Sequence, residues 1–438
     1  MLRTLFILAL VAIGGFFALQ EPFYGLLFYI ANAYFRPEEW VWTSLIGNLH
    51  LSLVSGAYVV LGALFSGRRL ALNWRLILIG IFLFHTLVST LLGEYFENDW
   101  DPWINFLKTI LIVFSMQVLI TDYSKFRIVL LVMVLALGLE GAKQGWFYIL
   151  TKPGFANENS IPFLGDNNGV AVGMLMLVPI IGFLVQTAQS RRARQLYWVL
   201  FIGVLYRALS TFSRGGFLSC LVMVGMWWLR SQKKLRAAFA ILLCATVLLP
   251  ALPESFWHRM QTIQTYEEAN DSSALGRLHF WKVAVDMANA NPVFGVGLNS
   301  YREAYDAYDF STGRYGSSRA VHSSFFGLLA ELGYAGLILA LYIFWGALRS
   351  CVRVRRLARR GETSLEFGYI ATALETSLVV FLVGGSFLAF QYNEMLWHIV
   401  GLTIVLERLA TQREPAVALG DASGKKETVS SKGMPEAA

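Results

Sequence analysis

The sequence predicts an all-α fold, a polytopic membrane bundle of helices with one large periplasmic loop. Hydrophobic residues make up 56% of the 438 positions, and charged residues make up only 15%. A soluble domain carries about 25% charged residues, so this chain lacks the polar surface that a soluble enzyme needs. Long apolar runs recur along the chain, and basic loops alternate with acidic or sparsely charged ones. These three observations exclude a soluble globular enzyme and a disordered chain.

Each predicted span is an apolar run of about 20 residues, the length that crosses a bilayer core roughly 30 Å thick. The N-terminal stretch 2–35 has two interpretations, because it fits either two helices, 2–19 and 23–35, or one span followed by an interfacial segment. The expected count is therefore 12 transmembrane helices, or 13 if both N-terminal helices cross. The other eleven runs are 45–65, 75–93, 103–121, 127–150, 168–189, 195–211, 213–230, 236–252, 322–348, 365–388 and 394–410.

Basic residues gather in alternate short loops, which the positive-inside rule assigns to the cytoplasm. These five basic loops are 66–75, 122–127, 191–194, 230–236 and 349–362. The intervening loops then face outside, which is the periplasm if the chain lies in a bacterial inner membrane. The net charge of +7 thus reflects topology, and nucleic acid is not an expected partner.

Residues 253–321 form a connection far longer than the other loops. Structureless loops of such length are uncommon and usually functional. Leu278, Trp281 and Val285 recur at helical spacing, which predicts a helix that stops before Pro292. The expected organisation is an N-terminal transmembrane bundle at 1–252, a partly helical periplasmic loop at 253–321, C-terminal transmembrane helices at 322–410 and a disordered cytoplasmic tail at 411–438.

Two arginines on the outer face are not explained by the positive-inside rule. Arg214 lies in the turn Ser-Arg-Gly-Gly, and Arg207 lies within the preceding span. A guanidinium pair suits a phosphate through bidentate contacts, although both side chains could instead snorkel to the interface. The two unexplained arginines are thus Arg214, with Arg207 as its neighbour, and Arg277, which shares a helix face with Trp281. Either this helix is solvated and Trp281 anchors it at the lipid headgroups, or the helix lies on the membrane and Arg277 binds a lipid pyrophosphate.

His322 opens a predicted span, where the positive end of the helix dipole disfavours protonation. A neutral imidazole there can take a proton from an acceptor hydroxyl. The alternative is a histidine that caps its helix or binds a lipid headgroup. Glu331 lies about two turns further along, where a carboxylate needs a partner or must be neutral. Asp166, Asn167 and Asn168 open another span, either as an ordinary cap or as sugar-binding groups.

The sequence holds no P-loop, no HExxH and no GxSxG motif. Their absence disfavours an ATP-driven pump and a nucleotide-sugar transferase. Three cysteines exclude a disulfide framework and do not form a metal cluster. Neither a cofactor nor a metal is expected.

Four motifs occur in a fixed order. They are Ser-Arg-Gly-Gly at 213–216, Gly-Arg-Leu-x-x-Trp at 276–281, Asn-Pro-x-x-Gly-x-Gly at 291–297 and His322 ahead of Leu-x-Glu-x-Gly-x-x-Gly at 329–336. This pattern resembles the O-antigen ligase and polymerase superfamily, which includes bacterial protein O-oligosaccharyltransferases, most clearly over about 160–350. Residues 20–24, 36–37 and 165–168 resemble the O-glycosylation ligase branch associated with the exosortase A system.

The resemblance implies a polyprenyl-diphosphate-dependent glycosyltransferase among membrane lipids. Such enzymes transfer a glycan from undecaprenyl pyrophosphate to an acceptor hydroxyl on a protein, lipid or glycan. Arg214 and Arg277 would match the family's pyrophosphate-binding arginines, and His322 its essential histidine. Ser323 follows that histidine where many members have Asn, as expected in the exosortase-associated branch. The expected substrate-binding residues are Arg207, Trp281, Asp166, Asn167, Asn168 and Glu331.

Two alternatives remain open from sequence. A polymerase of the same fold would use a second lipid-linked glycan as acceptor. A flippase or other transporter is favoured by Glu140, Lys143 and Glu375, which lie within spans. Against a transporter, no inverted repeat is evident, and the reactive residues gather on one face rather than at the midplane.

Overall fold

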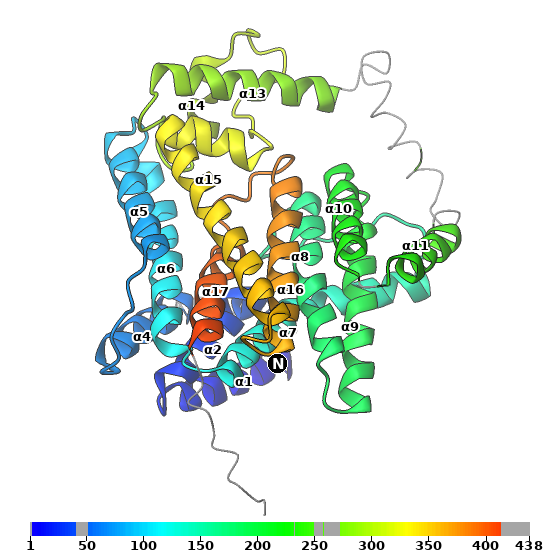
Figure 1. The fold of residues 1–438 in the computed structure, drawn as a ribbon. Coiled ribbons are helices and arrows are strands. Elements are labelled where there is room, and N and C mark those ends of the chain that lie inside the picture. The colour runs from blue at the N-terminus through cyan, green and yellow to red at the C-terminus, as the bar shows by residue number, and fades with distance from the viewer. Residues whose placement is uncertain (1, 41–50, 232, 249–256, 258–271, 413–438) are drawn as a thin grey trace, which may run out of the picture.

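The computed structural model describes residues 2–40, 51–231, 233–248, 257 and 272–412, and its regular structure there is helical, with no strand. The all-α prediction is confirmed for this part of the chain (Figure 1). The elements are α1 (Leu2–Ala18), α2 (Pro22–Phe35), the 3-10 helix η1 (Pro37–Trp40), α4 (Leu51–Phe65), α5 (Trp74–Leu92), α6 (Phe96–Leu119), α7 (Tyr123–Thr151), α8 (Asn167–Gln186), α9 (Arg191–Leu209), α10 (Arg214–Arg230), α11 (Lys234–Leu248), α13 (Ser272–Ala290), α14 (Tyr301–Tyr308), α15 (Ser324–Arg359), α16 (Leu365–Gly384) and α17 (Glu394–Thr411).

The ambiguous N-terminal stretch forms two separate helices. Pro22 begins α2, which suits a residue that has no N–H to donate in the first turn. Arg36 ends the helix in the left-handed conformation, and Pro37 follows it. Part of the predicted run at 45–65, and the tail beyond residue 412, lie outside the described residues.

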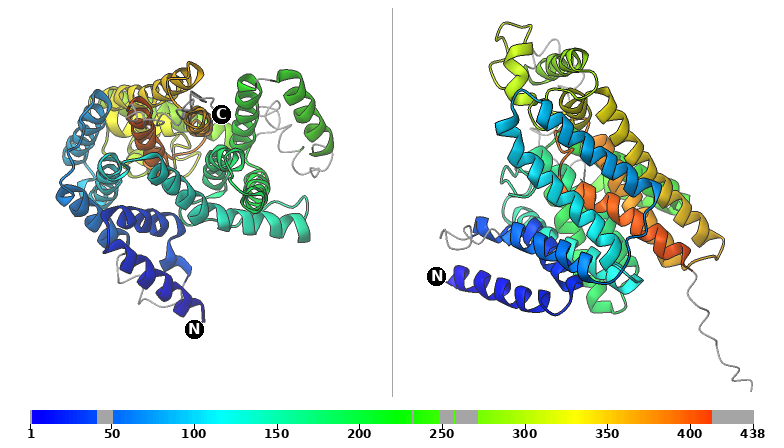
Figure 2. Two further views of the ribbon diagram at one scale, coloured as in Figure 1. Left: turned by 60° about the horizontal axis from the view of Figure 1, so that its bottom comes forward. Right: turned by 90° about the vertical axis from the view of Figure 1, so that its left-hand side faces the viewer.

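Five helices of the described part are long and apolar enough to cross a membrane, namely α5, the part of α6 from Asn98 to Leu119, α8, α15 and α16. The predicted total of 12 or 13 spans stays a prediction. Helix α8 is central, because 89% of its apolar stretch is buried inside the protein. A helix that is apolar all round needs neighbours on every side. Figure 2 shows α5, α6 and α17 running side by side along the bundle.

Ion pairs bring three of the five basic loops together at one end of the bundle, the basic end. Arg75 and Arg353 lie 2.5 and 2.8 Å from the carboxylate of Glu407. Arg230 and Arg355 both bind Glu375. Their alignment at the basic end agrees with the predicted alternation of loops.

At the opposite end, the loop end, α13 lies across the bundle and α14 packs against it (Figure 1). The helix predicted to stop before Pro292 is confirmed, since α13 ends at Ala290. Most of 253–271 lies outside the described residues. Phe280, Val283, Met287 and Tyr305 form a small apolar core between α13, α14 and the first turns of α15.

Helix α15 is broken at Gly333, which the single predicted span 322–348 did not anticipate. Gly333 has φ 67° and ψ −175°, a conformation that essentially only glycine adopts. The break exposes the carbonyls of Ala330 and Glu331, which accept hydrogen bonds from the N–H groups of Val296 (3.0 Å) and Gly297 (3.2 Å). The Asn-Pro-x-x-Gly-x-Gly turn therefore docks into the break and holds the α13–α14 layer on the bundle.

Candidate active site at the loop end

His322 lies in the short segment that leads into α15, and α13 holds that segment in place. The indole Nε1 of Trp281 donates to the carbonyl of Val321 at 3.2 Å, and its ring stacks on Phe326 with centroids 5.0 Å apart. The hydroxyl of Ser323 accepts from the N–H of Phe326 and so caps α15. Trp281 and Ser323 therefore position His322, which has a positive φ of 49°.

The surroundings of His322 favour its neutral form. Burial lowers the pKa of the imidazole, and the positive charge of Arg277 lowers it further. Arg302 and Arg319 act in the same direction, whereas the carboxylate of Asp166 opposes them. The histidine and the arginine expected from the motifs are thus close enough to interact, although they come from different elements.

Arg214 is the first residue of α10, beside the start of α8. The hydroxyl of Ser213 accepts from the N–H of Gly216 (3.2 Å) and donates to the side-chain oxygen of Asn168 (2.7 Å). Asp166 caps α8 by accepting from the N–H of Gly169 at 2.9 Å. These bonds join two segments that the sequence predicted separately.

The loop 385–391 connects the starts of α10 and α15. The N–H of Ser324 donates to the carbonyl of Gly385 at 2.6 Å, and its hydroxyl donates to the carbonyl of Leu388 at 2.8 Å. The ring of Phe387 covers Gly215, where an added Cβ would lie 3.0 Å from the Phe387 side chain. Three helix N-termini, those of α8, α10 and α15, consequently meet at the loop end. Their dipoles favour negative charge there.

One of the predicted binding residues is fully buried among protein groups, and a second is partly buried. Arg207 is 0% exposed; its Nε donates to Gln144 at 2.7 Å, and its other nitrogens bind the carbonyls of Asn157 and Asn159. Its guanidinium therefore joins α7 and α9 to the 157–159 segment. Asn167 has a buried side-chain oxygen with no hydrogen-bond partner in the described part of the chain.

Glu331 is also buried, and it binds two residues that the sequence did not single out. Its carboxylate accepts from the hydroxyl of Tyr392 at 2.9 Å and from the amide of Gln391 at 3.2 Å. Both partners lie in the loop between two C-terminal apolar runs, where no motif marks them. The intramembrane carboxylate thus has the partners that its position demands.

A cavity of about 530 Å³ adjoins the segment that carries His322. Its lining includes Val321, Glu331 and Arg302, and the last of these supplies a cation that the sequence did not predict. The other walls come from 162–165, 299–303 and 389–393. Within the described residues, no group of three or more His, Cys, Asp or Glu side chains is placed to hold a metal ion.

The turn after α14 is anchored by Asp309. Its carboxylate accepts from the N–H groups of Ser311 (2.8 Å) and Gly313 (2.9 Å) and lies 2.8 Å from the Nε2 of His279. Burial alone would raise the pKa of Asp309, but these hydrogen bonds outweigh it and lower the pKa to about 2. The fixed turn leads into the segment that bears Arg319 and His322.

Arg214, Arg277 and His322 all fall within one stretch of the chain that can be compared with known families. Residues 198–341 match the O-antigen ligase family. This match supports the superfamily inferred from the motifs, which consists of membrane glycan ligases and polymerases. Residues 2–189 match a family of unknown function (DUF5935). No curated protein matches the chain.

Proposed function

We propose that the protein transfers a glycan from undecaprenyl pyrophosphate to an acceptor hydroxyl at the loop end. The observation that carries the proposal is a histidine kept neutral beside an arginine, where helix N-termini converge. Glycosyl transfer from a diphosphate without a metal needs a general base for the acceptor hydroxyl and, beside it, a site that binds the anionic leaving group. The match over 198–341 includes every residue to which the proposal gives a catalytic role.

Arg214 and Arg277 would bind the diphosphate of the donor. As the glycosidic C–O bond breaks, negative charge develops on the departing pyrophosphate, and preorganised cations stabilise it. His322 would remove the proton from the acceptor hydroxyl, whose oxygen forms the new bond to the anomeric carbon. The proton stays on the imidazole and the polyprenyl pyrophosphate leaves, so direct displacement inverts the anomeric centre.

The location follows from the same proposal. The basic end would face the cytoplasm of a bacterial inner membrane, and the loop end would face the periplasm. The motifs at 20–24 and 165–168 favour the exosortase-associated O-glycosylation branch, in which the acceptor hydroxyl belongs to a protein, a lipid or another glycan.

A reconstituted assay with lipid-linked donor and candidate acceptors tests the proposal. His322→Ala should reduce transfer by ~10²–10⁴-fold, the contribution of a positioned base. Arg277→Ala should reduce it by ~10²–10³-fold, the effect of losing one preorganised donor at a developing charge. The matched control is Arg314→Ala, since Arg314 lies over Tyr315 and is not among the charges that act on His322.

Normal transfer by both alanine variants, with correct membrane insertion, would refute the mechanism. The products separate the related activities. A ligase attaches a glycan to a different acceptor, whereas a polymerase lengthens a second lipid-linked glycan. Movement of the donor across the membrane without any new glycosidic bond would indicate a transporter.

A further inference from the structure

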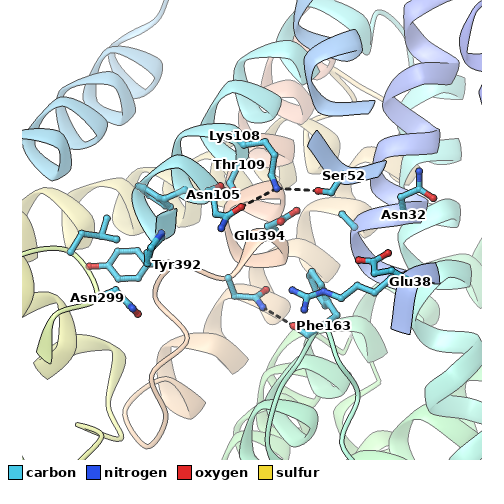
Figure 3. A pocket seen from close by; sticks show the side chains of 16 residues that line it. Asn32, Glu38, Ser52, Asn105, Lys108, Thr109, Phe163, Asn299, Tyr392 and Glu394 are labelled. Carbon is cyan, nitrogen blue, oxygen red and sulfur yellow. Dashed lines mark hydrogen bonds between the residues drawn. The ribbon is translucent and has the colours of Figure 1, made fainter. Parts of the chain in front are cut away.

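A second cavity lies among α2, α4, α6 and the start of α17, and the proposed mechanism does not use it. Figure 3 shows the side chains that line this cavity, whose volume is about 390 Å³. It shares part of its lining with the cavity near His322, namely Phe163, Asn299, Tyr392 and Asn393. The two cavities are therefore neighbours separated by a common wall.

The charges around this second cavity balance. Arg36 and Lys108 contribute two cations, and Glu38 and Glu394 contribute two carboxylates. The ammonium of Lys108 donates to the Ser52 hydroxyl at 3.0 Å and to an amide oxygen at 3.3 Å. Such a lining gives no net preference for an anion or a cation, in contrast to the arginine-rich site beside His322.

The lining is rich in groups that both donate and accept hydrogen bonds. Four asparagines contribute amides, and Ser52 and Thr109 contribute hydroxyls. Asn32 is only 7% exposed, and its amide nitrogen has no hydrogen-bond partner in the described part of the chain. A buried N–H without a partner is costly, so this donor is poised for an acceptor inside the cavity.

Aromatic rings supply the apolar part of the wall. Phe106 and Tyr392 pack edge to face with centroids 5.3 Å apart, and Phe163 also lines the cavity. Convergent amides and hydroxyls beside aromatic rings match a sugar, which has hydroxyls at its edge and apolar faces. The volume lies at the lower end of the ~300–1,000 Å³ typical of small-molecule sites, so it fits a short saccharide rather than a polymer.

Tyr392 connects this cavity to the candidate active site. Its ring lines both cavities, and its hydroxyl donates to the carboxylate of Glu331 at 2.9 Å. We propose that the second cavity is a binding subsite for a short, uncharged saccharide segment of the glycan substrate. The identity of that substrate rests on the proposed function, but saccharide binding here requires no catalysis.

Binding of free saccharides to the purified full-length protein tests this subsite. The probes are methyl glycosides of neutral hexoses and N-acetylhexosamines, together with their disaccharides, titrated by tryptophan fluorescence or saturation-transfer NMR. Asn32→Leu and Thr109→Val should each weaken binding by about tenfold, the equivalent of one hydrogen bond of ~1.4 kcal/mol. The matched control is Thr403→Val, because Thr109 and Thr403 are both buried and both donate to a carbonyl of their own helix, but only Thr109 lines the cavity.

The same titrations separate the subsite from the catalytic proposal. His322→Ala should reduce transfer by the ~10²–10⁴-fold given above yet retain saccharide binding. Competition by intact lipid-linked donor, but not by bare undecaprenyl pyrophosphate, would assign the bound sugar to the donor, whereas competition by the acceptor glycan alone would assign it to the acceptor. The subsite proposal is overturned if no saccharide binds saturably, if an acidic saccharide binds in preference, or if Asn32→Leu and Thr109→Val bind as tightly as Thr403→Val.

Discussion

Four charged residues shift the pKa of His322, three in one direction and one in the other. Arg277, Arg302 and Arg319 lower the pKa of the imidazole, and Asp166 raises it. A base acts in its deprotonated form, so transfer should be fully active above this lowered pKa and fall as the pH drops through it. The acid limb of the pH–rate profile should therefore lie below pH 6.5, the ordinary pKa of histidine.

Substitutions of two of these neighbours should move that limb in opposite directions. Arg302→Gln removes a repelling cation, so the pKa of His322 and the acid limb should rise by about a few tenths of a pH unit, as expected for one screened charge. Asp166→Asn removes the attracting carboxylate and should move the limb down, while asparagine preserves the helix cap. The measurement is kcat/KM against pH, with Arg314→Gln as the unshifted control. Shifts of the same sign in both variants would show that His322 is not the titrating group.

Arg207 illustrates a residue whose burial argues for a structural role. Its guanidinium binds Gln144 and two carbonyls of the 157–159 segment in different directions, which a lysine ammonium cannot reproduce. Arg207→Lys should cost roughly 1.5–3 kcal/mol for each charged hydrogen bond lost. The apparent Tm in detergent should fall, while kcat/KM of the folded fraction should stay near that of the unaltered protein. An unchanged Tm with a large loss of transfer would instead place Arg207 in substrate binding.

At the scale of elements, the break in α15 couples the loop layer to the bundle. In Gly333→Ala the new Cβ would lie 2.6 Å from the carbonyl oxygen of Pro292, in a backbone conformation reserved for glycine. Strain of ~1–3 kcal/mol should result, with loss of the docked 292–297 turn. Thermal unfolding and limited proteolysis of the loop layer measure it. Gly225→Ala is the control, because that helical glycine has open space around its Cβ position.

If Gly333→Ala unfolds at the same temperature and is cleaved at the same rate as the unaltered protein, the break does not stabilise the loop layer.

The sequence could not predict this break. Gly333 and Gly336 both look like ordinary glycines within an apolar run, since the groups that satisfy the freed carbonyls come from residues far away in the chain. Ser89 and His85 on α5, for example, bind the carbonyls of Glu331 and Leu332.

Local patterns predicted the elements well because their causes are local. The spacing of apolar residues and the proline at 292 were enough to place α13, and the apolar runs located most of the other helices. Helix α6 nevertheless begins seven residues before its predicted run, and α15 ends eleven residues after its own. The sequence also pointed to Arg277 and Asp166, two of the four charged residues that act on His322. The partners of Glu331, the role of Trp281 as a positioning residue and the cavity beside Asn32 were not predictable, because each depends on segments brought together only by the tertiary fold.

At the scale of the whole molecule, the alternation of basic and acidic loops predicts how the protein is oriented in the membrane. Ion pairs already bring basic loops together at one end, while the α13–α14 layer lies at the other (Figure 1). The turn that carries Arg314 is tied to α13 through the contact between Asp309 and His279. If the positive-inside rule sets the orientation, the basic end is cytoplasmic. The claim can be tested with single cysteines placed at each end, in a background where the three native cysteines, Cys220, Cys244 and Cys351, are replaced by alanine.

Arg314→Cys and Arg192→Cys are suitable reporters because both side chains are exposed and lie outside the proposed chemistry. A membrane-impermeant maleimide should label Arg314→Cys once the outer membrane is permeabilised, and should label Arg192→Cys only after the inner membrane is opened. Both variants should react fully in detergent, which controls for local accessibility. The reverse pattern would invert the proposed orientation and put the candidate active site in the cytoplasm, where a periplasmic acceptor could not reach it. Labelling of both from the same side would mean that the number of spans between the two positions, and hence the predicted topology, is wrong.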